Sequence, residues 1–429
     1  MGLPDRKDVP VHQTWDVGIL YENDDAWQKD IEAEKKALAD FSKYDQKLND
    51  PETIISALDD LGEMEVRMDL LGHYGFLQQS TDMTDPHYNQ LLRILDQLEA
   101  DYNAELAKYR AQIMDNDNET LDAVSDKRPD LGAAIREFKR IKKHRLSSEV
   151  ESALSSIEPT LSSFEGIYTT CRAADMSFPD FEVDGKTYPL SFVLYENSYQ
   201  YNPDHKLRHA AFKAFSKVLN QYKNTVAANY YAQVSKEKNM ATLRGYDSVF
   251  DYLLDDQEVP REFFDRQIDV IIEKLGPVMQ KYVKLIQKER GLDKLTFSDL
   301  QIDLDPEFAP KVPLDKAPEY ISDAIKVLGP KYHDMIMKCF DERWVASPAN
   351  KGKETGGFET TPYGKHAYIL MSWTDEMADV YTLVHELGHA GQEMLTNKTN
   401  HPLSCGVSTY IVEAPSTFNE LLLTHALED

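Results

Sequence analysis

Cysteine is scarce in this chain: only Cys171, Cys339 and Cys405 occur among its 429 residues. They lie far apart in the sequence and lack the close spacing of cysteine metal ligands. An odd and sparse cysteine count excludes a disulfide framework and is typical of proteins from a reducing compartment. We therefore expect a cytoplasmic protein.

Long apolar runs are also missing. No stretch of about 18 consecutive apolar residues is present, so the sequence predicts no membrane-spanning helix. The first residues, MGLPDRKDVPVHQTW, contain no apolar segment of the kind found in secretory signals.

Basic residues are outnumbered, because 47 Lys and Arg face 74 Asp and Glu, which gives a formal net charge of −27. Such a surface repels phosphate backbones and anionic lipids, so we expect neither a nucleic acid nor a membrane as partner. The rest of the composition is that of a globular protein, with 41% hydrophobic and 28% charged residues. The chain is long enough for two or three domains.

Helix signals dominate the first half of the chain. Apolar residues recur at helical spacing between residues 24 and 41, and Asp24 and Asp25 could cap this helix. At Asp50–Pro51 and again at Asp85–Pro86, an N-cap residue precedes a proline that suits the first helical position. Further helices are expected at about 131–146 and 148–175.

The helical pattern is first interrupted at residues 178–190, FPDFEVDGKTYPL. Two short alternating runs flank the Asp184–Gly185 pair, which is a strong hairpin turn signal. A long helix resumes near Asp204. We place the domain boundary here, with a helical N-terminal region at residues 1–190 and a second domain at residues 191–429.

A small β element and a helix are predicted near the end of the chain. Glycines at Gly356 and Gly357 indicate a loop, and the apolar run at residues 367–373 suits a strand. Thr374 or Asp375 could then cap a helix with an apolar stripe. Its polar edge carries both histidines of the stretch TLVHELGHAGQEML, residues 382–395.

The pattern H-E-x-x-H on a helix has a direct chemical meaning. His385 and His389 are four residues apart and project from the same face, so both can bind one tetrahedral Zn²⁺. Glu386 is rotated by about 100° from His385 and is placed to accept a proton from a water molecule that the metal activates. Gly388 leaves the helix bare beside the ligands, which suits the close approach of another backbone. The pattern also arises by chance in a chain this long on the order of once in a hundred.

A third ligand follows downstream, in YIVEAPSTFNELLL. Glu413 completes a His₂Glu set with a fourth position open to water, and Pro415 is expected in the first turn of the next helix. His401 and His425 are also near Glu413 in the sequence, but His401 follows a loop-like stretch and is discounted. Cys405 falls between the ligands, but we do not expect it to bind zinc at an open catalytic site.

The two stretches together resemble the oligoendopeptidase F family of zinc metallopeptidases, relatives of thimet oligopeptidase and neurolysin. The pairing of H-E-L-G-H with E-A-P-S is much more specific than H-E-x-x-H alone, and the similarity extends over nearly the whole chain. It implies a mainly α, multi-helical zincin-type fold, a small β element beside the active-site helix and a deep channel for short peptides. It also implies one Zn²⁺ per chain, held by His385, His389 and Glu413, with Glu386 as the catalytic base.

Several neighbouring residues are candidates for supporting roles. Glu420 and, less directly, Asp379 could accept a hydrogen bond from a ligating imidazole, although both could equally be solvated acids. Residues 367–373 could hold an extended peptide by strand addition, or could simply form a buried strand. On the first interpretation the substrate-binding residues include His366, Ala367, Tyr368, Gly356 and Gly357, with the two glycines in a loop that closes over the substrate.

The end of the chain and the reaction leave alternatives open. Similar enzymes continue beyond Asp429, so we expect the 191–429 catalytic domain to be incomplete at its C-terminus, and a separate C-terminal fragment of the same enzyme is a candidate partner. The N-terminal region would form part of the channel wall. The sequence predicts a zinc endopeptidase acting on short peptides, with a zincin exopeptidase or an inactive zinc- and peptide-binding module as alternatives.

Overall fold

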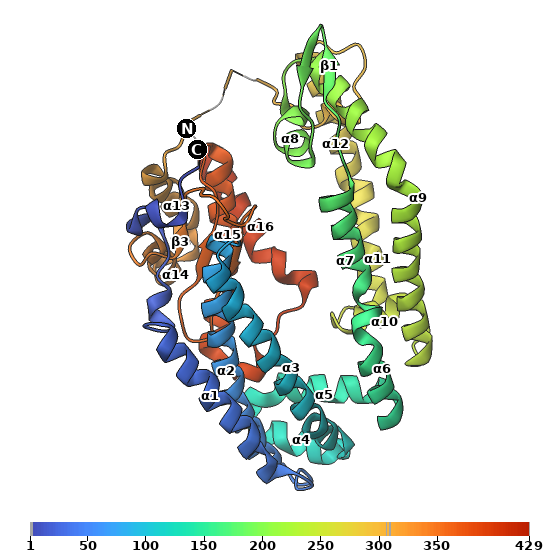
Figure 1. Cartoon of the computed structure of the whole chain (residues 1–429), viewed down its shortest axis with the longest axis vertical. Helices are drawn as coiled ribbons and strands as arrows, with labels where there is room; N and C mark the ends of the chain where they lie inside the picture. Colours follow the sequence, from blue (N-terminus) through green and yellow to red (C-terminus); the bar gives the residue numbers. More distant parts are fainter. Residues whose placement is uncertain (1–2, 306, 309, 429) are drawn as a thin grey trace. The chain divides into compact units, whose positions relative to one another are not determined.

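The chain forms two compact units in the computed structural model, which describes residues 3–305, 307–308 and 310–428 (Figure 1). Unit 1 combines the segments Met1–Lys143 and Pro310–Asp429, and unit 2 is the continuous segment His144–Ala309. The units therefore divide the chain at 143/144 and 309/310. The expected boundary near residue 190 falls inside unit 2 instead.

Unit 1 is mainly helical. Its helices are α1 (Asp24–Asp40), α2 (Pro51–Thr81), α3 (Pro86–Asp115), α4 (Asn118–Lys127), α5 (Gly132–His144), α13 (Ala317–Ile325), α14 (Pro330–Met337), α15 (Met377–Thr399) and α16 (Thr409–Glu428). As predicted, Asp50 and Asp85 accept hydrogen bonds from the first turns of α2 and α3, which begin with proline. The cap of α1 is Asn23 rather than Asp24 or Asp25, because the Asn23 side chain accepts from the Ala26 N–H.

A three-stranded sheet lies within unit 1. Its strands are β3 (Val345–Ala346), β4 (Phe358–Thr360) and β5 (Tyr368–Leu370), in the order β3-β5-β4. The central strand β5 is fully buried and pairs in parallel with β3 and antiparallel with β4. One face of the sheet packs with Trp15 and α1–α3 in one apolar core, and α13–α16 share a second core with the other face.

Unit 2 is built around a long helix. Its elements are α6 (Ser148–Leu161), α7 (Ser163–Thr170), the strands β1 (Phe181–Val183) and β2 (Lys186–Tyr188), α8 (Phe192–Asn197), α9 (His205–Leu243), α10 (Val249–Asp255), α11 (Arg261–Val270) and α12 (Gly276–Glu289). The predicted β1–β2 hairpin is present, with Asp184 and Gly185 at φ of 49° and 79° in its turn. It contributes to an apolar core on α9 that includes Phe181, Tyr199 and Phe215.

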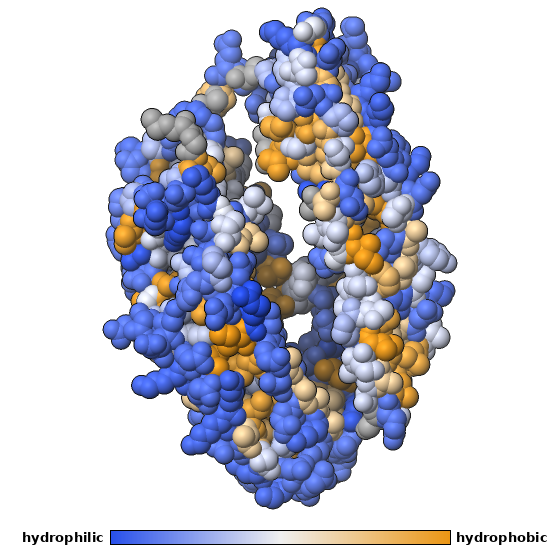
Figure 2. Space-filling model, in the orientation of Figure 1, coloured by the Kyte–Doolittle hydropathy of each residue, from blue (hydrophilic) through white to orange (hydrophobic). Residues whose placement is uncertain are grey.

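The expected helix at 148–175 is divided. α6 ends at Leu161, α7 begins at Ser163, and a π-helical turn follows at Cys171–Asp175. The surface is mostly hydrophilic in one view, with apolar patches between the polar regions (Figure 2). Within the described part of the chain, no helix combines the length and the apolar character that a membrane span requires.

Candidate metal centre

α15 carries the two histidines and begins at an acidic cap. Glu376 and Asp379 form a reciprocal capping box, in which Asp379 accepts hydrogen bonds from the backbone N–H groups of Glu376 (3.0 Å) and Thr374 (2.7 Å). The helix therefore starts one or two residues later than a cap at Asp375 or Thr374 would give. Asp379 is occupied at the helix start, so the structure does not place it against either imidazole.

The apolar stripe of α15 fixes the direction of the histidines. Val380, Leu383, Val384 and Leu387 are all fully buried in the core shared with α13 and α16. Because a helix that buries this stripe turns its other face away from the core, the imidazoles of the helix lie at the edge of the core.

Gly388 allows α16 to approach α15 very closely. A Cβ atom at this position would lie 2.6 Å from the Ser416 Cα and 2.7 Å from the Pro415 carbonyl oxygen. Any other residue would therefore force the two helices apart. The prediction that Gly388 admits a second backbone matches this contact, and the contact brings Glu413 to the histidines.

α16 differs from the prediction at its start. The helix begins at Thr409, so Pro415 lies inside it rather than in its first turn. Proline lacks the N–H that would otherwise bond to the carbonyl of Ile411. Asn419, one turn further on, donates to the Val384 carbonyl of α15 at 3.1 Å and ties the two helices together.

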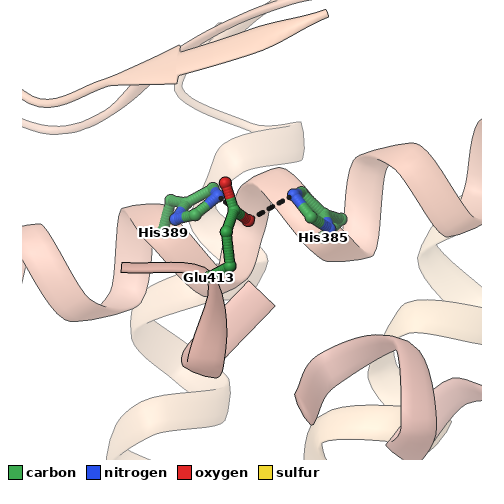
Figure 3. Close-up of side chains that lie close together, drawn as sticks. All are labelled: His385, His389 and Glu413. Atoms are coloured by element: carbon green, nitrogen blue, oxygen red, sulfur yellow. Dashed lines mark ion pairs between the residues drawn. The ribbon is translucent and has the colours of Figure 1, made fainter. Parts of the chain in front are cut away.

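His385, His389 and Glu413 converge (Figure 3). Glu413 Oε2 lies 3.2 Å from Nε2 of His385 and 3.2 Å from Nε2 of His389. One potential ligand atom from each residue falls within 4.8 Å of the others, and this is the one such group of His, Cys, Asp or Glu side chains among the described residues. The side chain of Glu413 keeps 62% of its exposure, so the cluster is open to solvent.

Neighbouring groups hold these side chains in place. Glu420, two turns after Glu413 on α16, contacts Nδ1 of His385 at 2.6 Å. The Ser416 hydroxyl donates to Glu413 Oε2 at 2.8 Å and thereby lowers the pKa of Glu413. Burial lowers the pKa of His389. A neutral imidazole at His389 and an ionised carboxylate at Glu413 are the forms in which these groups bind metals.

Glu386 stands beside the cluster in a drier environment. It is only 8% exposed, and this burial raises its pKa to about 7, with His385 lowering the value and Glu413 raising it. A carboxyl group with a pKa near neutrality is suited to exchange protons with a reacting group.

Strand β4 lies next to Glu386. A Cβ atom on Gly357 would stand 3.8 Å from Glu386 Oε1. Of the substrate-binding residues predicted on the strand, Ala367 and Tyr368 are fully buried, and β5 is paired on both sides. A peptide therefore cannot add to β5, and the edge that faces α15 belongs to β4. The sequence does not predict β4 as a strand, because its three residues have no marked apolar alternation.

The remaining predicted substrate residues have different positions. His366 stacks on Trp344 and lines a separate pocket of about 530 Å³, whose lining includes none of the three cluster residues. Gly356 is exposed at a φ of 94°, immediately before Gly357. The structure thus brings Gly357 to Glu386 and leaves His366 elsewhere.

Two acidic residues near Glu386 were not singled out from the sequence. Glu359 of β4 and Glu393 of α15 both have raised pKa values, in each case mainly because of burial. The spacing of Glu386 and Glu393, seven residues on one helix face, was the one signal available.

Comparison with known proteins identifies the family. The sequence pattern of peptidase family M3 matches residues 198–428, and the pattern named Oligopeptidase F matches residues 112–178. The chain belongs to peptidase family M3. Oligopeptidase PepF of Bacillus subtilis is 28% identical over 427 residues, and the oligoendopeptidase F homolog of Borreliella burgdorferi is 26% identical over 426 residues.

Solved structures share the mainly α-helical fold. A Chlamydophila abortus protein superposes with a TM-score of 0.83 at 21% identity, covering 99% of this chain and 72% of its own. The oligoendopeptidase-F of Enterococcus faecium gives a TM-score of 0.63 at 20% identity, covering 94% of this chain and 67% of its own.

The matches are unequal in length. The alignments with the two relatives each cover 98% of this M3 chain. They cover only 63% of the B. subtilis protein and 71% of the B. burgdorferi protein. The chain thus spans less than two thirds of the B. subtilis relative.

Proposed function

We propose that this chain is a zinc-dependent endopeptidase that hydrolyses internal bonds of short peptides. The observation that carries the proposal is the convergence of His385, His389 and Glu413 from two helices, with potential ligand atoms within 4.8 Å of one another. Membership of peptidase family M3 supports it. The relatives' printed names, oligopeptidase and oligoendopeptidase, suggest the same substrate class.

The donor set suits zinc. Two imidazoles and one carboxylate form the His₂Glu combination of catalytic zinc sites. Glu420 accepts from Nδ1 of His385 and so leaves Nε2, the atom that faces Glu413, as the metal-binding nitrogen. Zn²⁺ held by these residues would supply Lewis-acid chemistry, polarising a peptide carbonyl and acidifying a water molecule.

Glu386 is the residue we assign to proton transfer. Its carboxylate accepts the proton of the attacking water and then returns a proton to the nitrogen of the departing amine. Its burial excludes competing solvent, and its pKa near 7 keeps both protonation states accessible at neutral pH.

The edge of β4 is the surface that we expect to align the peptide. An extended peptide can pair with an exposed strand edge through backbone hydrogen bonds, which tolerate many side chains. Gly357 stands beside Glu386, so a peptide on this edge passes the assigned base.

The test is hydrolysis of a peptide with a fluorophore and quencher on either side of internal bonds, with and without a chelator. We expect cleavage at internal bonds by mass spectrometry, loss of activity with the chelator and recovery on adding Zn²⁺. Glu386→Gln should retain one zinc per chain by metal analysis and lose about 10²–10⁴-fold in kcat. Glu319→Gln, exposed on α13, is the matched control and should keep wild-type turnover.

Other outcomes point to different functions. Release of single residues from peptide ends would indicate an exopeptidase. Zinc and peptide binding without any cleavage would indicate a binding module. Full activity in the Glu386→Gln variant would refute the role of Glu386.

A further inference from the structure

The edge of β4 offers backbone hydrogen bonds over a very short length. The direction of its backbone N–H and C=O groups follows from the hydrogen bonds of the central strand β5. Ile369 and Met371 of the β5 segment donate their N–H groups to Trp344 and Ala346 of the β3 segment, at 2.8 Å and 3.2 Å. The polar groups of Ile369 therefore face β3, because the N–H and C=O of one strand residue point to the same side.

The pairing register between β5 and β4 then gives the direction of the backbone groups of β4. Glu359 stands opposite Ile369, while Phe358 and Thr360 stand opposite Leu370 and Tyr368. Because the polar groups of Ile369 face away from β4, Glu359 forms a non-hydrogen-bonded pair and directs its own N–H and C=O outward. No partner for either group occurs among the described residues. The alternation along a strand directs the N–H and C=O of Gly357 outward as well.

Beyond Glu359 the edge is closed by side chains of the protein itself. The Thr361 N–H donates to Glu393 Oε2 at 3.1 Å, and the Thr361 carbonyl accepts from Asn397 Nδ2 at 3.3 Å. Pro362 has no N–H, and proline is a common device for blocking a strand edge. The Tyr363 N–H donates to Asp69 Oδ2 at 2.7 Å.

The other end is closed by backbone conformation. Gly356 has a φ of 94°, which takes the chain out of the extended region. An added strand therefore cannot continue past Gly357 in this direction. The open edge consists of Gly357 and Glu359, and Gly357 is the residue next to Glu386.

We propose that this two-residue edge fixes the register of the substrate, and that Glu393 and Asn397 stop strand pairing at Thr361 by taking the places of a substrate backbone. The inference rests on the peptidase function proposed above. A peptide residue that pairs with Glu359 is the last one, on the Thr361 side, to gain backbone bonds from β4. Glu393 and Asn397 are therefore specificity-determining residues that limit the useful length of a peptide on one side of the cleaved bond.

Two peptide series test the proposal. Both share one cleavable bond, and they are extended one residue at a time on its N-terminal or C-terminal side. For the wild-type enzyme, kcat/KM should stop rising on one side within the residues that the two-residue edge can pair. In the Glu393→Ala/Asn397→Ala variant, the next residues on that side should raise kcat/KM by about 3- to 10-fold, the effect of one or two added backbone hydrogen bonds.

The matched control is Glu393→Gln. The amide oxygen of glutamine can still accept from Thr361, so this variant should keep the wild-type plateau. Asn397→Ala alone frees only the Thr361 carbonyl and should give a smaller gain on the same side. Zinc content and thermal unfolding are measured on every variant. The double variant is used only if its zinc content and its Tm match those of the wild type. If they do not, the peptide series measured on Asn397→Ala tests the proposal.

The outcomes separate this proposal from the one it rests on. A wild-type enzyme whose kcat/KM keeps rising with length on both sides would overturn the two-residue edge. A folded, zinc-loaded Glu393→Ala/Asn397→Ala variant whose kcat/KM stops rising at the same peptide length as in the wild type would overturn the role of Glu393 and Asn397. Failure of the wild type to cleave any peptide would instead refute the peptidase function.

Discussion

Glu420 lies outside the three candidate metal ligands and contacts one of them. Its carboxylate contacts Nδ1 of His385 at 2.6 Å, so it selects the ring nitrogen that faces Glu413. We expect Glu420→Ala to weaken zinc binding about 10–100-fold, since partners of ligating histidines commonly have effects of this size. Competition with a chromogenic chelator measures the affinity.

A conservative variant distinguishes this role from a purely structural one. Glu420→Gln keeps an oxygen that can accept from Nδ1 and should recover much of the affinity. Glu428→Ala, exposed at the end of the same helix, should bind zinc like the wild type. Equal affinity in Glu420→Ala and the wild type would contradict the assignment.

Glu359 makes the stability of unit 1 depend on pH. Burial raises its pKa well above the ordinary 4.5, Glu393 and Glu386 raise it further by repulsion, and a hydrogen bond from Thr361 opposes them. Its Oε2 is buried and has no hydrogen-bond partner among the described residues. The folded chain therefore keeps a proton that the unfolded chain releases above pH 4.5.

The sign of the effect follows from proton linkage. Because the folded state binds more protons than the unfolded state, the free energy of unfolding falls as pH rises above about 4.5. Glu359→Gln removes this pH-dependent fall in the free energy of unfolding, because glutamine does not titrate. We expect the Tm of the variant to match the wild type near pH 4 and to exceed it by a few degrees at pH 8. Calorimetry across this range checks it, and a variant that is less stable at pH 8 would contradict the prediction.

At the scale of elements, the crossing of α15 and α16 assembles the site. Gly388→Ala places a methyl group 2.6 Å from the Ser416 Cα, so α16 must move and carry Glu413 with it. Overpacking of this kind costs about 1–3 kcal/mol of stability. We expect a lower Tm together with a reduced zinc content.

The matched control is Gly72→Ala on α2, where an added Cβ meets nothing within 4 Å. Removing a helical glycine there should leave zinc content unchanged and raise stability by about 0.4–1 kcal/mol. If both variants behaved alike, the close crossing would not be what positions Glu413.

The same elements show what the sequence could predict. H-E-x-x-H on a helix specifies its own geometry, because residues four apart share a face. The pairing of strands does not follow from residues 367–373, since an apolar run fits a central strand whichever strand forms the edge. That β4 is the edge, and that Glu393 and Asn397 close its end, depends on contacts between segments that carry no local signal.

On the scale of the whole molecule, unit 1 is assembled from two distant segments. Trp15 packs edge-on against Tyr368 with ring centroids 5.9 Å apart, and the Arg343 side chain donates to the Thr14 carbonyl at 2.9 Å. The hairpin near residue 184 is a real turn, but it belongs to the interior of unit 2. A boundary placed from local turn signals cannot reveal that residues 144–309 are inserted between two halves of one core.

This organisation predicts unequal behaviour of the isolated segments. Residues 144–309 contain their own core on α9 and a buried ion pair between Arg208 and Asp299, so this segment should fold alone. We expect a helical circular dichroism spectrum and a cooperative thermal transition. Residues 1–143 keep the apolar core between α1 and α5. They lose the strands supplied by residues 310–428, on which Trp15 packs, so this segment should unfold at a lower temperature alone than in the whole chain. A 144–309 segment without a cooperative transition, or a 1–143 segment that is as stable alone as in the whole chain, would contradict the division.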